Sequence, residues 1–209
     1  MNYKNILFDL DGTLIDSATG IEQSFNIAYR SIFQADCPVS IKHLIGPPIN
    51  EVLYAVAGTI DPNTEKLFVK EFKQHYDTEG HKSSILYPGT LDFLEYLYLR
   101  GINLFIATNK RHRPASLIIA YFSLNKFFKA IHCPDSLEKK FNNKSELVNN
   151  LLYTFSLKND ETLFVGDTFH DGFAAEQNNL KFALVKYGYG DYPNPTYRVD
   201  KLKDLLNII

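Results

Sequence analysis

The hydrophobic positions of the chain follow two patterns, one typical of buried strands and the other of helices. Short apolar runs, each followed by polar or turn residues, indicate buried strands. They lie at residues 4–10, 102–107, 129–133, 162–165 and 181–185. Between them, apolar residues recur at helical spacing, as at residues 90–99 and 144–153. Strands that alternate with helices predict an α/β fold with a parallel sheet covered on both faces.

A long stretch after the first strand breaks this alternation, because residues 18–86 have helical patterns and no clear strand. Asp61 followed by Pro62 predicts a helix start, with the aspartate as N-cap and the proline at the first helical position. Aromatic residues then recur at every fourth position, namely Phe68, Phe72 and Tyr76. Their spacing predicts a helix face that packs against neighbouring helices.

These patterns predict two domains. We expect residues 1–16 and 87–209 to form the α/β core, and residues 17–86 to form an inserted helical domain. The chain would pass between the two near residues 16–20 and 83–89. We expect a hinge at these passages, because closure of such a domain can exclude water from a site.

The composition is that of a globular protein, with 45% hydrophobic and 22% charged residues among 209. The 22 basic and 24 acidic residues give a formal net charge of -2, so no strong field favours nucleic acid or an anionic membrane. The start lacks the apolar run of a signal peptide, and no run of 18 apolar residues occurs. We therefore expect a cytoplasmic protein with neither nucleic acid nor a membrane as partner. Cys37 and Cys133 are expected to be free thiols.

The first strand ends in two aspartates, Asp9 and Asp11, followed by Gly12 and Thr13. An unpaired carboxylate beside an apolar strand is strongly disfavoured, so a positive partner is expected nearby. Residues i and i+2 point to the same side of a strand, so the two carboxylates can converge. Such a pair can bind a hard cation or divide the roles of nucleophile and general acid/base. An ordinary Asp-Gly turn is the alternative.

The strand at residues 102–107 is followed by Thr108, Asn109 and Lys110. A hydroxyl and backbone N–H groups where a helix begins can hold an anion, because the helix N-terminus has unpaired donors. An ordinary N-cap is the alternative. The residues that follow, Arg111, His112 and Arg113, could reach a substrate, but a solvated basic helix start is the favoured interpretation.

A third candidate is Lys144, which opens an amphipathic helix. A lysine near a phosphate would neutralise charge on a nucleophile and on the transferred group. A solvated surface charge is the alternative for any single lysine. Lys139 and Lys140 compete for the same role.

The strand at residues 162–165 leads into a fourth acidic segment that contains Asp167 and Asp171. Two carboxylates at a strand end suit Mg²⁺, which prefers a few carboxylate oxygens together with water and phosphate. His170 lies between them, but a hard cation selects oxygen ligands. We therefore do not expect His170 to be a ligand.

Each of the four motifs by itself is a weak signal of function, but their order along the chain makes the combination specific. DLDGT, then TNK, then a lysine that opens a helix, then GDTFHD resemble the four motifs of haloacid dehalogenase-superfamily phosphatases. The resemblance covers nearly the whole chain, and the helical insert resembles the type-1 cap of the phosphoglycolate phosphatase-like branch. Gly46, Pro47 and Pro48 resemble the substrate-specificity loop of that branch. The resemblance implies a Rossmann-like core, Mg²⁺ as cofactor and a small phosphorylated metabolite as substrate.

The resemblance also implies a role for each motif residue. Asp9 would attack phosphorus and form an aspartyl-phosphate, and Asp11 would protonate the leaving group and then activate water. The residues implied to contact substrate are Asp9, Gly12, Thr108, Asn109 and Lys144, of which Asp9, Thr108 and Lys144 are also implied to be catalytic. The implied metal ligands are Asp9, the backbone carbonyl of Asp11, Asp167 and, as direct or indirect support, Asp171.

Other activities of the superfamily are weighed against these residues. Dehalogenases lack an aspartate at the position of Asp11, so its presence favours phosphoryl chemistry. Phosphomutases usually carry a cap histidine and a cap arginine where this chain has Ile21 and Ile49, which disfavours a mutase. A non-catalytic phosphometabolite-binding protein is the alternative of a different class. The substrate stays open among phosphoglycolate, a sugar phosphate and a nucleotide. The oligomeric state stays open between a monomer and a homodimer.

Overall fold

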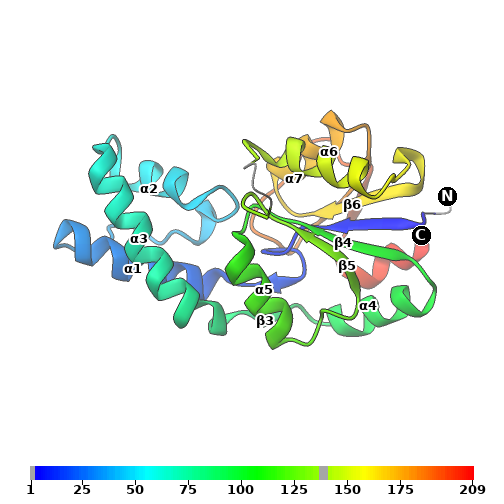
Figure 1. The fold of residues 1–209 in the computed structure, drawn as a ribbon, viewed down its shortest axis with the longest axis horizontal. Coiled ribbons are helices and arrows are strands. Elements are labelled where there is room, and N and C mark those ends of the chain that lie inside the picture. The colour runs from blue at the N-terminus through cyan, green and yellow to red at the C-terminus, as the bar shows by residue number, and fades with distance from the viewer. Residues whose placement is uncertain (1–2, 137–140) are drawn as a thin grey trace.

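A parallel sheet forms the centre of the core in the computed structural model, which describes residues 3–136 and 141–209. The strands lie in the order β5-β4-β1-β6-β7-β8, and all neighbouring pairs are parallel. Their bounds are β1 Asn5–Phe8, β4 Asn103–Ala107, β5 Phe128–His132, β6 Thr162–Gly166, β7 Lys181–Val185 and β8 Tyr197–Val199. Because β1 lies between β4 and β6, the carboxyl ends of these three strands are adjacent (Figure 1).

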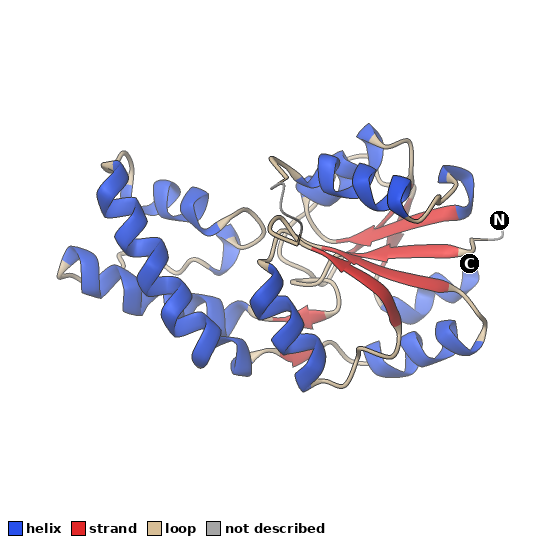
Figure 2. Ribbon diagram, viewed as in Figure 1, coloured by secondary structure: helices blue, strands red, loops and turns tan. Residues whose placement is uncertain are grey.

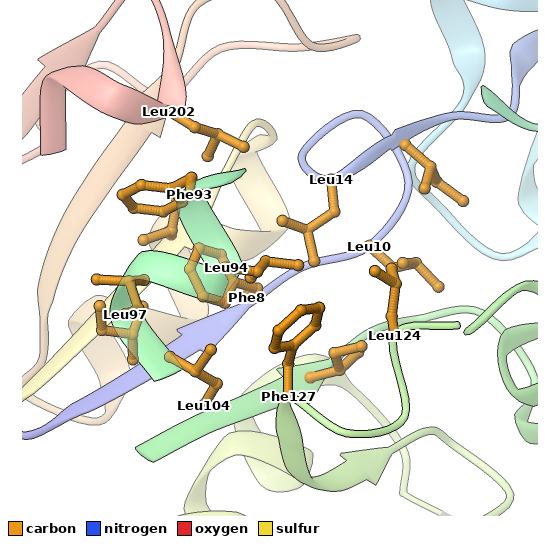
Figure 3. Packing of buried hydrophobic residues seen from close by; sticks show 14 of the residues in the cluster. Phe8, Leu10, Leu14, Phe93, Leu94, Leu97, Leu104, Leu124, Phe127 and Leu202 are labelled. Atoms are coloured by element: carbon orange, nitrogen blue, oxygen red, sulfur yellow. The ribbon is translucent and has the colours of Figure 1, made fainter. Parts of the chain in front are cut away.

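Helices cover both faces of this sheet (Figure 2). The covering helices are α4 Thr90–Leu99, α5 His112–Tyr121, α6 Lys144–Thr154 and α7 Phe169–Gln177, with short 3₁₀ turns at η3 Asn159–Glu161 and η4 Leu202–Asn207. Ile6 and Phe8 of β1 join the hydrophobic cluster under α4 and α5, whereas Leu7 joins the cluster under α6 and α7. The ring of Phe8 packs edge-on to Phe93 of α4, with centroids 6.2 Å apart (Figure 3). Because successive side chains of β1 point to opposite faces of the sheet, this strand contributes to a hydrophobic cluster on each face.

The helical insert extends from the carboxyl-terminal side of the sheet (Figure 1). It consists of α1 Ala18–Phe33, α2 Ile49–Ala57 and α3 Pro62–Thr78, with 3₁₀ turns at η1 Lys42–Leu44 and η2 Gly80–Ser83. The Asp61 carboxylate accepts hydrogen bonds from two backbone N–H groups of the first turn of α3, as predicted. Phe68 of α3 is fully buried 4.9 Å from the ring of Phe25 in α1. Burial of such a side chain contributes about 2 kcal/mol, so the aromatic stripe holds the insert together.

The structure corrects the sequence analysis at the passage between core and insert. No strand was predicted between residues 18 and 86, yet β3 (Ile85–Leu86) pairs antiparallel with β2 (Ile15–Asp16). Strand β8 was not predicted either. Elements of two or three residues are too short to show an alternating pattern. Within the described part of the chain, no helix is long and apolar enough to cross a membrane.

Candidate active site

The four predicted motifs meet at the carboxyl edge of the sheet. Asp9 follows β1, Thr108 follows β4 and Asp167 follows β6, and these strands are neighbours. Side chains of the core and of the insert line a pocket of about 660 Å³ at this edge. Ligands of open parallel sheets bind outside the carboxyl ends of the strands, so this pocket is the candidate active site.

Lys144 is the positive partner of the first motif. It is the first residue of α6, is 5% exposed, and donates from Nζ to Asp9 Oδ1 at 2.5 Å. It also forms an ion pair with Asp171 Oδ1. Burial by itself would lower the pKa of Lys144, but the carboxylates of Asp171 and Asp9 raise it above its ordinary value. The amine is therefore a permanent positive charge beside Asp9.

Three buried carboxylates gather around this lysine. Oxygen atoms of Asp9, Asp167 and Asp171 all lie within 4.8 Å of one another. Burial raises the pKa of Asp9 to about 7, against the lowering effect of Lys144. Burial, together with the charges of Asp171 and Asp9, raises the pKa of Asp167 well above its ordinary value. With all three carboxylates ionised, the cluster and Lys144 together carry two negative charges, and the donors are hard oxygens, so the cluster fits a divalent cation such as Mg²⁺.

Asp167 is fixed in a narrow slot between two glycines. A side chain at Gly12 or at Gly188 would collide with its carboxylate, and Gly12 has a φ of +85° that favours glycine. The Thr13 hydroxyl donates to Asp167 Oδ1 at 3.0 Å, and the Tyr189 backbone N–H donates to Oδ2 at 2.8 Å. The segment from Gly188 to Gly190 thus orients a carboxylate of the cluster.

Asp171 is held by its own helix terminus. Its Oδ2 accepts from the Thr168 backbone N–H at 2.9 Å, from the Thr168 hydroxyl at 2.6 Å and from the Asp167 N–H at 3.2 Å. Its Oδ1 pairs with Lys144. One oxygen is therefore hydrogen-bonded and the other ion-paired within the protein, which makes Asp171 an anchor for Lys144 and for the loop that carries Asp167.

The Asp11 carboxylate lies apart from this cluster. Lys110 donates to both of its oxygens, at 2.8 and 2.9 Å, and the Ser17 hydroxyl donates to Oδ1 at 2.5 Å. Burial would lower the pKa of Lys110, but the Asp11 carboxylate raises it. The sequence predicted no role for Lys110. A partner 99 positions away along the chain leaves no spacing signal, so only the fold reveals it.

Thr108 and Asn109 line the pocket. The Thr108 hydroxyl oxygen accepts from the Lys110 N–H at 3.1 Å, so its own proton can be donated to an anion. The Asn109 side chain donates to the carbonyl of Gly46 in the insert at 3.4 Å. Helix α5 begins only at His112, so residues 108–110 form a loop before the helix and not its first turn.

Arg111 joins the core to the insert. Its guanidinium donates to both oxygens of Asp77 at the end of α3, at 2.5 and 3.0 Å. The side chains are 26% and 12% exposed, respectively, so the interpretation of Arg111 as a solvated residue was wrong. Next to it, Lys110 Nζ lies 4.6 Å from the centroid of the Tyr76 ring in α3. One loop therefore contacts both the acidic site and the insert.

The remaining predicted residues lie as follows. The Gly12 N–H donates to the Ile15 carbonyl at 2.8 Å within its turn, and its contact with substrate stays a prediction. The carboxylate cluster formed by the described residues does not include His170. Lys139 and Lys140 lie outside the described residues.

The chain is similar to known proteins over most of its length. Residues 6–185 match the family model described as haloacid dehalogenase-like hydrolase. The chain is 32% identical to a 5'-nucleotidase of Pseudomonas aeruginosa over 192 residues, which covers 91% of this chain and 86% of that protein. It is 27% identical to a phosphoglycolate phosphatase of Pseudomonas fluorescens, over 96% of this chain and 78% of that protein.

A solved structure shows the same architecture. The crystal structure of a predicted phosphatase from Clostridium acetobutylicum superimposes with a TM-score of 0.90 at 27% identity. The match covers 100% of this chain and 98% of that one. The helical insert is therefore included in the similarity, together with the sheet.

Proposed function

From its membership of the haloacid dehalogenase-like hydrolases, the family to which this chain belongs, we propose that it hydrolyses a small phosphomonoester through an aspartyl-phosphate on Asp9. The family resemblance and the phosphatase class are confirmed by the comparisons. The observation that carries the finer proposal is the position of Asp9. Its carboxylate lies in the pocket, contacts Lys144 and belongs to the cluster with Asp167 and Asp171.

The first step transfers the phosphoryl group to the protein. A carboxylate oxygen of Asp9 attacks phosphorus, the P–O bond to the leaving group breaks, and Asp11 donates a proton to the departing oxygen. The Thr108 hydroxyl and the backbone of Asn109 hold the phosphate oxygens, and Lys144 offsets their charge. These contributions suit phosphoryl transfer, in which the protein mainly positions groups and neutralises charge.

The second step hydrolyses the aspartyl-phosphate and regenerates the free Asp9 carboxylate. Asp11, now a carboxylate, takes a proton from water, and the water oxygen attacks the phosphorus of the aspartyl-phosphate. The acyl-phosphate P–O bond breaks and inorganic phosphate leaves. A divalent cation held by Asp9, Asp167 and the Asp11 carbonyl, with Asp171 in support, would supply positive charge next to the phosphate.

A mutase receives no support from the pocket. Ile21 and Ile49 occupy the positions where phosphomutases carry a histidine and an arginine, and both line the pocket. An apolar side chain cannot move a proton or bind a second phosphate. We therefore retain hydrolysis as the activity.

Metal removal tests the cofactor in two independent ways. At neutral pH, Mg²⁺ is expected to raise the thermal midpoint of the chelated protein, because a cation neutralises carboxylates whose charged forms are penalised by burial. Phosphate release from 4-nitrophenyl phosphate should fall to background in EDTA and return with Mg²⁺. The shift in midpoint should shrink in Asp167→Asn. Equal activity with and without chelator would contradict a metal-dependent phosphatase.

Asp11→Asn separates acid/base catalysis from nucleophilic attack. Removal of a general acid typically lowers the reaction rate by about 10²–10⁴-fold. We expect a loss of rate in this range for alkyl phosphates, whose leaving group needs a proton. The loss in phosphoenzyme formation should be much smaller for 4-nitrophenyl phosphate, whose leaving group needs no proton. Rapid-quench measurement of both steps provides the comparison. An equal loss for the two kinds of leaving group would contradict the role of Asp11 as acid.

A further inference from the structure

The walls of the pocket differ between its two halves. The core half carries the charged and polar side chains of the chemistry, including Asp9, Asp11 and Lys144. The insert half is mostly hydrocarbon, and its apolar lining side chains are Ile21, Ile45, Ile49, Val52, Val69 and Phe72. With phosphate held against the core half, the leaving group must face this hydrocarbon wall.

The cations of the core half already have carboxylate partners. Lys144 pairs with Asp9 and Asp171, Lys110 pairs with both oxygens of Asp11, and Arg111 pairs with both oxygens of Asp77. A second anionic group on a substrate would have to compete with these carboxylates for the same cations. Breaking a buried pair leaves an uncompensated charge and is strongly unfavourable.

The insert half offers one acid and one base among its described lining residues, Glu65 and Lys73, both on α3. Glu65 accepts a hydrogen bond from the Tyr54 hydroxyl at 2.7 Å and would repel a second anion. Lys73 lies one helical turn before Asp77. The insert therefore has no cluster of cations, within the described lining, that matches a second phosphate or a carboxylate.

The pocket also has room and rigid apolar side chains for a ring. Its volume of about 660 Å³ lies within the range of pockets that enclose drug-sized ligands. Pro47, Pro48, Pro114 and Phe141 place rigid rings on its lining. These apolar rings, of which Phe141 is aromatic, can pack against a cyclic leaving group.

We propose that this chain selects phosphomonoesters whose leaving group is uncharged and carries a ring, in preference to esters with a second anionic group. The inference rests on the proposed function, since it concerns the leaving group of the same reaction. A carboxylate or second phosphate would lose its hydration against the apolar wall, where Lys73 is the single cation of the described insert lining. A ring would exchange water for apolar contact on the insert side.

Matched substrates test the charge requirement. 4-Carbamoylphenyl phosphate and 4-carboxyphenyl phosphate have nearly the same shape and differ in charge. We expect kcat/KM to be at least about tenfold higher for the carbamoyl ester, since each 1.4 kcal/mol of discrimination is tenfold. Ethyl phosphate and phosphoglycolate form a second pair with the same number of carbon atoms. The kcat/KM for benzyl phosphate should exceed that for ethyl phosphate by a similar factor, because the ring of benzyl phosphate can contact the apolar wall.

Ile49 allows the wall itself to be changed. It is half-buried at the start of α2, where an arginine can reach the pocket. Ile49→Arg is expected to reduce the carbamoyl-to-carboxyl ratio at least about tenfold through the new charge, whereas the matched control Ile49→Leu should keep the ratio. Lys73→Met should change the carbamoyl-to-carboxyl ratio by less than about twofold, which corresponds to about 0.4 kcal/mol and is small against the expected discrimination.

The outcomes are distinguishable from failure of the proposed function. Absence of Mg²⁺-dependent hydrolysis of all these esters would overturn the phosphatase mechanism itself. Efficient hydrolysis of the carboxyl ester and of phosphoglycolate, at or above the rates of their uncharged partners, would overturn only the inference about the leaving group. Loss of that activity in Lys73→Met would then identify Lys73 as the partner of the anionic group.

Discussion

Asp9→Asn is expected to abolish both the phosphoenzyme and phosphate release. The amide keeps the shape of the side chain but is too weak a nucleophile to attack phosphorus. Loss of a catalytic nucleophile commonly costs several powers of ten, and we expect a reduction of at least about 10⁴-fold in kcat. Rapid-quench trapping with a radiolabelled phosphate ester measures the covalent intermediate directly.

The folded state provides the control for this variant. Burial raises the pKa of Asp9 to about 7 despite the nearby Lys144, so the charged carboxylate is unfavourable there in the absence of a divalent cation. The neutral amide is therefore expected to leave the thermal midpoint of the chelated protein unchanged or higher. A folded Asp9→Asn protein that still forms a phosphoenzyme would show that another residue is the nucleophile.

Lys144→Met is expected to reduce both activity and stability. The variant leaves Asp9 and Asp171 as buried carboxylates without their shared amine. Breaking a buried ion pair by removal of one partner typically costs about 3–5 kcal/mol, and loss of a charge that stabilises the transition state costs about 10²–10³-fold in kcat. Urea unfolding and steady-state kinetics measure the two effects.

The stability loss should depend on pH in a defined direction. Because the folded pKa of Asp9 lies above its ordinary value, its neutral form favours the folded state, and this contribution is lost as pH rises through the folded pKa. In the wild type, Lys144 offsets part of that loss. The deficit of the variant in chelator should therefore be small at acidic pH and grow as pH rises through about 7.

An exposed lysine is the matched control. Lys158 is 72% exposed and lies 3.7 Å from Glu161, and exposed ion pairs contribute little. Lys158→Met should leave both the unfolding curve and kcat nearly unchanged. A deficit in Lys144→Met that did not vary with pH would indicate lost packing and would contradict the role of the charge.

The sequence by itself determined the local elements and the order of the motifs. Apolar runs predicted the strands β1, β4, β5, β6 and β7, and Asp61 with Pro62 predicted where α3 begins. It also indicated which polar residues would meet, because Asp9, Thr108 and Asp167 each follow a strand and parallel strands align their carboxyl ends. These signals are local and periodic, so they can be recognised without the fold.

The tertiary structure alone decided which charges pair and what surrounds them. The contacts of Lys110 with Asp11, of Arg111 with Asp77 and of the Tyr189 N–H with Asp167 join distant segments. No spacing rule links such segments, since their approach depends on the order of the strands in the sheet and, for Arg111 with Asp77, on how the helical insert packs against the core. The apolar insert half of the pocket is likewise a product of packing, because Ile21, Ile49 and Val69 come from three different helices. The chemistry could therefore be anticipated from the motifs, whereas the selection among leaving groups depends on contacts that exist only in the folded chain.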